Sequence, residues 1–207
     1  MVLIGVQAIA VQKAAAAEKD TILVLGDSLS AAYGLRPEQG WVALLQKRLE
    51  TQGYGYSVTN ASVSGETSSG GLQRLPRALS LHKPAIVILE LGANDGLRGL
   101  PVAATRRNLT QMIELANSAG AKVLLVGIRM PPNYGPRFVE QFNASYADLA
   151  KTYKLPLVPF LLEKLALNPQ ALNPQLLQQD GLHPTAPAQP LLLDTVWPYL
   201  TPMLKKR

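Results

Sequence analysis

The chain contains no cysteine and only two histidines, and both shortages limit its chemistry. Without cysteine it can form no disulfide, no zinc–thiolate site and no cysteine nucleophile. The two histidines, His82 and His183, are too few for a metal centre built from several imidazoles. Any chemistry that depends on histidine must therefore use one of these two residues.

Clustered positive charge is also scarce, although the 207-residue chain has a formal net charge of +6. The 20 Lys and Arg residues are scattered, and only residues 205–207 form a basic run, which is typical of a solvated chain end. No basic stripe is interleaved with aromatics, so we expect no nucleic-acid partner. With 47% hydrophobic and 16% charged residues, the composition predicts one globular domain and excludes a disordered, collagen-like or coiled-coil chain.

The apolar stretch at residues 2–12 falls short of the roughly 20 residues that a membrane-spanning helix needs. It is followed by four alanines at 14–17, where cleavage after a small residue would fit a secretory signal peptide. The usual basic residues before the apolar stretch are missing and Lys13 follows it, so a start further upstream or a helical lead-in are the alternatives. We predict a signal peptide at 1–17, one domain at 18–207, and a periplasmic or secreted protein.

Hydrophobic runs alternate with amphipathic stretches from Asp20 onward. Continuous apolar runs, which suit strands buried on both faces, predict strands at 21–25, 54–60, 84–91, 121–128 and 155–160. Helical periodicity bounded by Gly or Pro predicts helices at 41–49 and at about 101–119, 136–153 and 191–200. This alternation predicts an α/β fold in which a five-stranded parallel sheet is covered by helices on both faces. Ligands bind beyond the carboxyl ends of such strands, so we expect function there.

Three of these strand ends carry residues suited to acyl transfer. Ser28 follows Gly26 and Asp27, where a nucleophile could meet substrate, although Asp27 or Ser28 could merely cap a helix. Asn94 has an amide that could donate to an oxyanion, or it could form an Asx turn. Gly65 could offer its N–H to the same oxyanion, or belong to a loop that leads into a helix. The chain has no Gly-x-Ser-x-Gly sequence, which counts against an ordinary α/β-hydrolase.

The segment from Asp180 to Pro184 supplies a candidate general base. Asp180 stands three residues before His183, so its carboxylate can reach Nδ1, fix the tautomer and leave Nε2 free. Pro184 restrains His183 to an extended backbone and keeps it off a helix. The other histidine, His82, precedes a predicted strand at its amino end, away from the expected site, and is predicted to lie on the surface.

The order and positions of these four segments resemble those of the SGNH (GDSL-type) hydrolase family over nearly the whole chain after residue 17. That family carries the Ser of Gly-Asp-Ser, a Gly, the Asn of Gly-x-Asn-Asp, and the Asp and His of Asp-x-x-His. The matching residues here are Ser28, Gly65, Asn94, Asp180 and His183. Longer stretches such as GDSLSAAYGL, NASVSGETSSGG and DGLHPTA are similar to the bacterial thioesterase I, lysophospholipase and arylesterase branch, whose members are typically periplasmic or exported.

The resemblance implies the flavodoxin-like three-layer α/β/α fold of the family, and hydrolysis of esters and thioesters through a Ser28 acyl-enzyme. His183 would take the serine proton and return it to the leaving group, while Asp180 orients the imidazole. The oxyanion would lie among the N–H groups of Ser28 and Gly65 and the amide of Asn94. The implied substrates are aryl esters, acyl-CoA and lysophospholipids, with peripheral contact to a lipid substrate, and neither a cofactor nor a metal is needed.

Two other functions remain open. Related SGNH enzymes deacetylate carbohydrates, and such an activity predicts a short acyl pocket and a polar groove. A doubly wound module that binds a nucleotide or flavin would use residues 26–30 as a phosphate loop, but neither glycine-rich signature of such loops occurs. Apart from Tyr33 and Arg98, the loops expected to border Ser28 are instead rich in small and apolar residues, which favours medium-chain acyl groups: Ala31, Ala32, Leu35, Leu97, Leu100 and Leu182.

Overall fold

The computed structural model of the chain describes residues 20–166 and 175–206. The predicted signal peptide at residues 1–17 lies outside the described residues. Within the described part, none of the helices combines the length and hydrophobicity that a membrane crossing requires.

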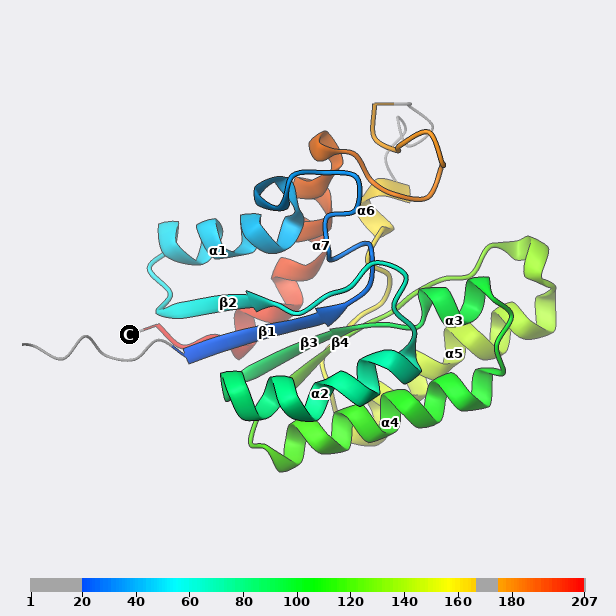
Figure 1. The fold of residues 1–207 in the computed structure, drawn as a ribbon, viewed down its shortest axis with the longest axis horizontal. Coiled ribbons are helices and arrows are strands. Elements are labelled where there is room, and N and C mark those ends of the chain that lie inside the picture. Colours follow the sequence, from blue (N-terminus) through cyan, green and yellow to red (C-terminus); the bar gives the residue numbers. More distant parts are fainter. Residues whose placement is uncertain (1–19, 167–174, 207) are drawn as a thin grey trace, which may run out of the picture.

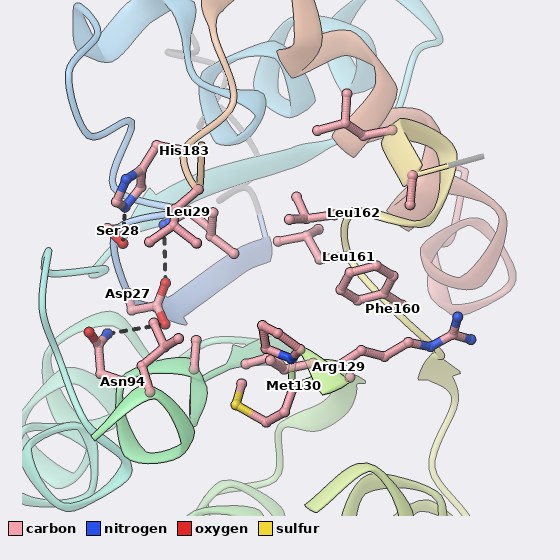
Figure 2. A pocket seen from close by; sticks show the side chains of 18 of the residues that line it. Asp27, Ser28, Leu29, Asn94, Arg129, Met130, Phe160, Leu161, Leu162 and His183 are labelled. Carbon is pink, nitrogen blue, oxygen red and sulfur yellow. Dashed lines mark hydrogen bonds between the residues drawn. The ribbon is translucent and has the colours of Figure 1, made fainter. Parts of the chain in front are cut away.

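The described residues form one five-stranded parallel sheet, which confirms the predicted fold class. Its strands are β1 (Asp20–Gly26), β2 (Tyr56–Asn60), β3 (Ile86–Glu90), β4 (Lys122–Val126) and β5 (Leu157–Val158), in the order β2-β1-β3-β4-β5. The chain moves outward from β1 to β2 and then returns to β3 on the other side of β1, so the loops after β1 and β3 diverge. A crevice forms at such a switch point, and the pocket of Figure 2 lies at this carboxyl edge.

Helices cover both faces of the sheet (Figure 1). They are α1 (Trp41–Thr51), α2 (Ser68–His82), α3 (Ala93–Leu97), α4 (Val102–Ser118), α5 (Pro136–Tyr153), α6 (Glu163–Ala166) and α7 (Gln189–Leu200). α1 and α7 lie on one face and α2, α4 and α5 on the other. The four predicted helices correspond to α1, α4, α5 and α7, whereas α2, α3 and α6 were not predicted.

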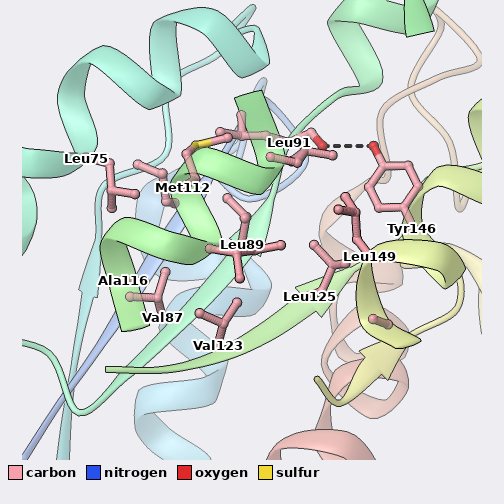
Figure 3. Close-up of a cluster of buried hydrophobic side chains, with 14 of the residues drawn as sticks. Leu75, Val87, Leu89, Leu91, Met112, Ala116, Val123, Leu125, Tyr146 and Leu149 are labelled. Atoms are coloured by element: carbon pink, nitrogen blue, oxygen red, sulfur yellow. Dashed lines mark hydrogen bonds between the residues drawn. The ribbon is translucent and has the colours of Figure 1, made fainter. Parts of the chain in front are cut away.

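The alternation of side chains along each strand divides the core into two clusters. In β1, Leu23 and Leu25 pack toward α2, α4 and α5, while Ile22 and Val24 pack toward α1 and α7. β3 and β4 alternate in the same way, which is why their sequences are apolar at successive positions. The first cluster is drawn in Figure 3, where the Tyr146 hydroxyl donates to the carbonyl of Leu91 at 2.9 Å.

Candidate active site

Hydrogen bonds on both sides of Ser28 fix the turn that follows β1. The Asp27 N–H donates to Glu90 Oε2 at 3.3 Å, and the Ser30 hydroxyl donates to the same oxygen at 2.7 Å. A side chain at Gly26 would place its Cβ 2.6 Å from that oxygen, so only glycine fits beneath the turn. No described helix begins at this turn, and the Ser28 side chain faces His183 instead of capping one.

Ser28, His183 and Asp180 form a hydrogen-bonded chain. The Ser28 Oγ lies 2.8 Å from His183 Nε2, and His183 Nδ1 lies 2.7 Å from Asp180 Oδ2. Backbone N–H groups of His183 and Leu182 donate to the other Asp180 oxygen and, in that order of effect, lower the pKa of Asp180 to about 2. An ionised carboxylate at Nδ1 favours a proton there, which leaves the lone pair of Nε2 directed at Ser28. His82, by contrast, ends α2 at the amino edge of the sheet and is half-buried.

Asn94 and Gly65 lie on the other side of the Ser28 turn. The Asn94 amide donates to the carbonyl of Glu66 at 2.9 Å and to Asp27 Oδ2 at 3.4 Å (Figure 2), so it faces the loop that holds Gly65. The backbone of Gly65 has a φ of +78°, which favours glycine. Among the described residues, the N–H groups of Ser28 and Gly65 have no hydrogen-bond acceptor. All five residues predicted for the site are therefore gathered at one edge of the sheet.

The sequence interpretation missed a buried carboxyl group under the Ser28 turn. Asp27 and Glu90 are both fully buried. Burial raises the pKa of Asp27 to about 6, against the opposing effects of the Leu29 N–H and of His183. Burial, and then the neighbouring Asp27, raise the pKa of Glu90 well above its ordinary value. The signal that could have identified Glu90 is a single carboxylate in the apolar run 84–91.

Asp95 is a second polar anchor whose role was not predicted. Its carboxylate accepts bonds from the Ser68 N–H at 2.8 Å, the Ser68 hydroxyl at 2.5 Å and the Thr105 hydroxyl at 3.2 Å. These bonds join α3 to the starts of α2 and α4. Asp95, the residue next to Asn94, thus holds α3 against α2 and α4 and so keeps Asn94 in place.

An apolar cavity of about 430 Å³ opens beside Ser28 and Asn94. Of the residues predicted to border the site, Leu97 and Leu182 line this cavity, but Ala31, Ala32, Leu35 and Leu100 do not. That part of the prediction was wrong: Ala32 is buried against Gly40, and Leu100 is exposed between α3 and α4, outside the cavity. Most of the remaining apolar wall comes from the segments that follow β4 and β5, α6 included (Figure 2): Gly127, Ile128, Met130, Pro131, Phe160, Leu161, Leu162, Leu165 and Ala166.

Comparisons with known proteins agree with this geometry. Residues 24–189 match the model of the GDSL-like Lipase/Acylhydrolase family. The chain is 54% identical to "Esterase TesA" of Pseudomonas aeruginosa over 93% of its own length and 92% of the relative. It is 44% identical to "Thioesterase 1/protease 1/lysophospholipase L1" of Escherichia coli strain K12, over 91% and 87% of the two chains. A solved structure, "Crystal Structure of TesA", superposes with a TM-score of 0.84 at 54% identity, over 89% of this chain and all of that one.

Proposed function

The chain belongs to the GDSL-like lipase/acylhydrolase family and is an ester hydrolase of the esterase and thioesterase type, and on that premise we propose that Ser28, His183 and Asp180 perform the hydrolysis. The family resemblance found in the sequence is confirmed by the family match. The observation that carries the assignment of roles is the chain of contacts at 2.8 Å and 2.7 Å from Ser28 through His183 to Asp180. Small-molecule esters are the substrates.

Acylation begins when Ser28 Oγ attacks the carbonyl carbon of the substrate and His183 Nε2 takes the hydroxyl proton. The ionised Asp180 stabilises the imidazolium that forms. The bond from the carbonyl carbon to the leaving oxygen or sulfur then breaks as the imidazolium returns its proton to that atom. In the second half, His183 takes a proton from water, the resulting hydroxide attacks the acyl carbon, and Ser28 Oγ leaves with the proton. No cofactor or metal enters either half of the cycle.

The tetrahedral oxyanion lies among the N–H groups of Ser28 and Gly65 and the amide of Asn94. Support comes from the two backbone N–H groups, which lack acceptors among the described residues. The Asn94 amide already has two acceptors, but its 3.4 Å bond to Asp27 is long for an N–H···O bond. The oxyanion replaces that weaker bond while the bond to Glu66 holds the amide in position.

The acyl chain of the substrate occupies the apolar cavity beside Ser28, which suits fatty acyl groups of aryl esters, acyl-CoA and lysophospholipids. This lining gives no support to a carbohydrate deacetylase, for which a polar groove was expected. Contact with a lipid substrate is confined to the edge of the sheet where this cavity opens, and no nucleic-acid partner is proposed.

Export of the protein is the second part of the proposal. Its support is the sequence of residues 1–17, where an apolar stretch precedes four alanines. Cleavage there leaves a domain at 18–207 in the periplasm or outside the cell. Expression of the full chain followed by mass measurement of the protein from the periplasmic fraction tests it: loss of 17 residues supports export, and an intact N-terminus contradicts it.

Substitution of the nucleophile tests the proposed roles. Ser28→Ala should abolish hydrolysis of p-nitrophenyl esters and acyl-CoA while the circular dichroism spectrum stays unchanged. Ser64→Ala is the matched control, because Ser64 is an exposed serine in the loop beside the site and has no proposed role. A Ser28→Ala variant with substantial activity would overturn the assignment.

A further inference from the structure

The loop that follows β2, residues 61–66, carries Gly65 although none of its residues is fully buried. The backbone N–H groups of Ala61 and Val63 donate to carbonyls of β1 at 2.8 Å and 3.0 Å, which fixes the first half of the loop. Among the described residues, the second half has no such bond to the sheet. The position of Gly65 therefore depends on side chains that reach the loop from neighbouring helices.

Arg74 of α2 fastens both ends of this loop. Its Nε donates to Glu66 Oε2 at 2.7 Å, and its Nη1 donates to the carbonyl of Ala61 at 2.9 Å. The Glu66 side chain is only 14% exposed, and it packs on the first turn of α2, where a side chain at Gly70 would collide with Oε1. Because a guanidinium is planar and rigid, its two bonds set the distance between the start and the end of the loop.

The backbone of Glu66 passes this constraint to two of the three proposed oxyanion donors. The N–H of Gly65 belongs to the residue directly before Glu66. The Asn94 amide donates to the carbonyl of Glu66 at 2.9 Å, so a displacement of Glu66 would also turn that amide. Oxyanion donors act only at hydrogen-bond distance from the developing charge, and a misplacement of about 1 Å can cost on the order of 10²-fold in rate.

We propose that Arg74 is a positioning residue that acts through Glu66 to hold the Gly65 N–H and the Asn94 amide in the geometry that the oxyanion requires. The inference rests on the proposed function. Arg74 does not line the apolar cavity, so its replacement should weaken stabilisation of the oxyanion and leave binding of the acyl chain unchanged. Arg98 donates to the carbonyl of Gly65 at 2.9 Å from the end of α3. The loop thus keeps a second attachment without Arg74, and the loss of activity should be partial.

The first test is the kinetics of Arg74→Met, which keeps the length of the side chain and removes both donors. With p-nitrophenyl butyrate, kcat should fall about tenfold to 10²-fold while KM changes by less than about twofold. Arg74→Lys should recover part of the loss, because an ammonium can pair with Glu66 but lacks the planar fork. Arg77→Met is the matched control at an exposed arginine of the same helix, and it should keep wild-type kinetics.

Two inhibitors separate oxyanion stabilisation from binding of the chain. Ser28 Oγ adds to the carbonyl carbon of 1,1,1-trifluorodecan-2-one, His183 takes the hydroxyl proton, and the carbonyl oxygen becomes an oxyanion. Decan-2-ol has the same carbon skeleton but cannot undergo this addition. Arg74→Met should raise the Ki of the ketone about tenfold to 10²-fold and change that of the alcohol by less than about twofold.

A wild-type kcat in Arg74→Met, or an unchanged Ki for the ketone, would overturn the proposal. Equal rises in the two Ki values would overturn it as well, since Arg74 would then support the cavity or the whole fold. If Arg74→Met does not fold, Glu66→Gln takes its place, because the amide removes the ion pair and keeps the size of the side chain. The Ki of the ketone should then rise about threefold to tenfold, and an unchanged value would contradict the proposal. A wild-type enzyme that the ketone does not inhibit would refute the proposed function itself, which is a distinguishable result.

Discussion

Lengthening the acyl chain of a p-nitrophenyl ester should raise kcat/KM until the cavity beside Ser28 is filled. The cavity has a volume of about 430 Å³ and its walls are mainly aliphatic and aromatic. Burial of each CH₂ group contributes about 0.8 kcal/mol, which corresponds to roughly a fourfold increase in kcat/KM. The four CH₂ groups that separate hexanoyl from acetyl esters therefore give an increase of at most on the order of 10²-fold.

The assay is initial-rate hydrolysis of p-nitrophenyl esters from acetyl to decanoyl, each below the concentration at which the ester aggregates. Figure 2 shows Phe160, Leu161 and Leu162 at the far side of the cavity from Ser28. Leu162→Trp fills that region, so the ratio of octanoyl to acetyl kcat/KM should fall. Leu81→Ala is the control, because Leu81 is 69% exposed at the end of α2 and should keep the wild-type profile.

A flat or falling profile from acetyl upward would refute this use of the cavity. Faster turnover of sugar acetyl esters than of octanoyl esters would replace the proposed activity with carbohydrate deacetylation. An unchanged ratio in Leu162→Trp would show that the acyl chain lies elsewhere.

Three further predictions concern single side chains. Asn94→Ala should lower kcat by roughly 10²- to 10³-fold with little change in KM, as loss of one oxyanion donor does, and steady-state kinetics with a wild-type kcat would refute the role. Asp180→Asn should lower kcat by up to about 10⁴-fold. The pKa of Asp180 is about 2, so Asp180 stays ionised between pH 7 and pH 4, and a loss of wild-type activity in that range must come from the titration of another group. The pKa of Asp27 is raised from 3.8 to about 6 in the folded protein, so the stability linked to its proton is complete below pH 3.8 and is lost as the pH rises through 6. The melting temperature of Asp27→Asn should therefore rise relative to that of the wild type between pH 4 and pH 8, and a constant difference would contradict the shift.

The strands were predictable because their residues alternate between two buried clusters, which leaves continuous apolar runs in the sequence. α2 was not predictable in the same way. Gly70, Gly71 and Pro76 all disfavour a helix, and tertiary contacts override these preferences. A side chain at Gly71 would place its Cβ 2.2 Å from Leu91 Cδ1, so glycine is required for the close packing of α2 on the chain after β3.

The candidate site was predictable residue by residue, but its assembly was not. Ser28 and His183 are 155 positions apart, and only the strand order brings their loops together. Glu90 escaped notice because its partner Ser30 lies on a different strand end, so no local pattern joins the two. The cavity walls were assigned to the wrong loops for a similar reason: sequence distance from Ser28 says nothing about the loops after β4 and β5.

The most direct test of the central claim is to find where a serine-directed phosphonate attaches to the chain. The account predicts one adduct per chain, located on Ser28 by mass spectrometry of peptides, with loss of activity in proportion to labelling. Ser64→Ala should label normally and Ser28→Ala should not label at all. An adduct on Ser30 or Ser64, or a Ser28→Ala variant that is labelled and active, would contradict the account.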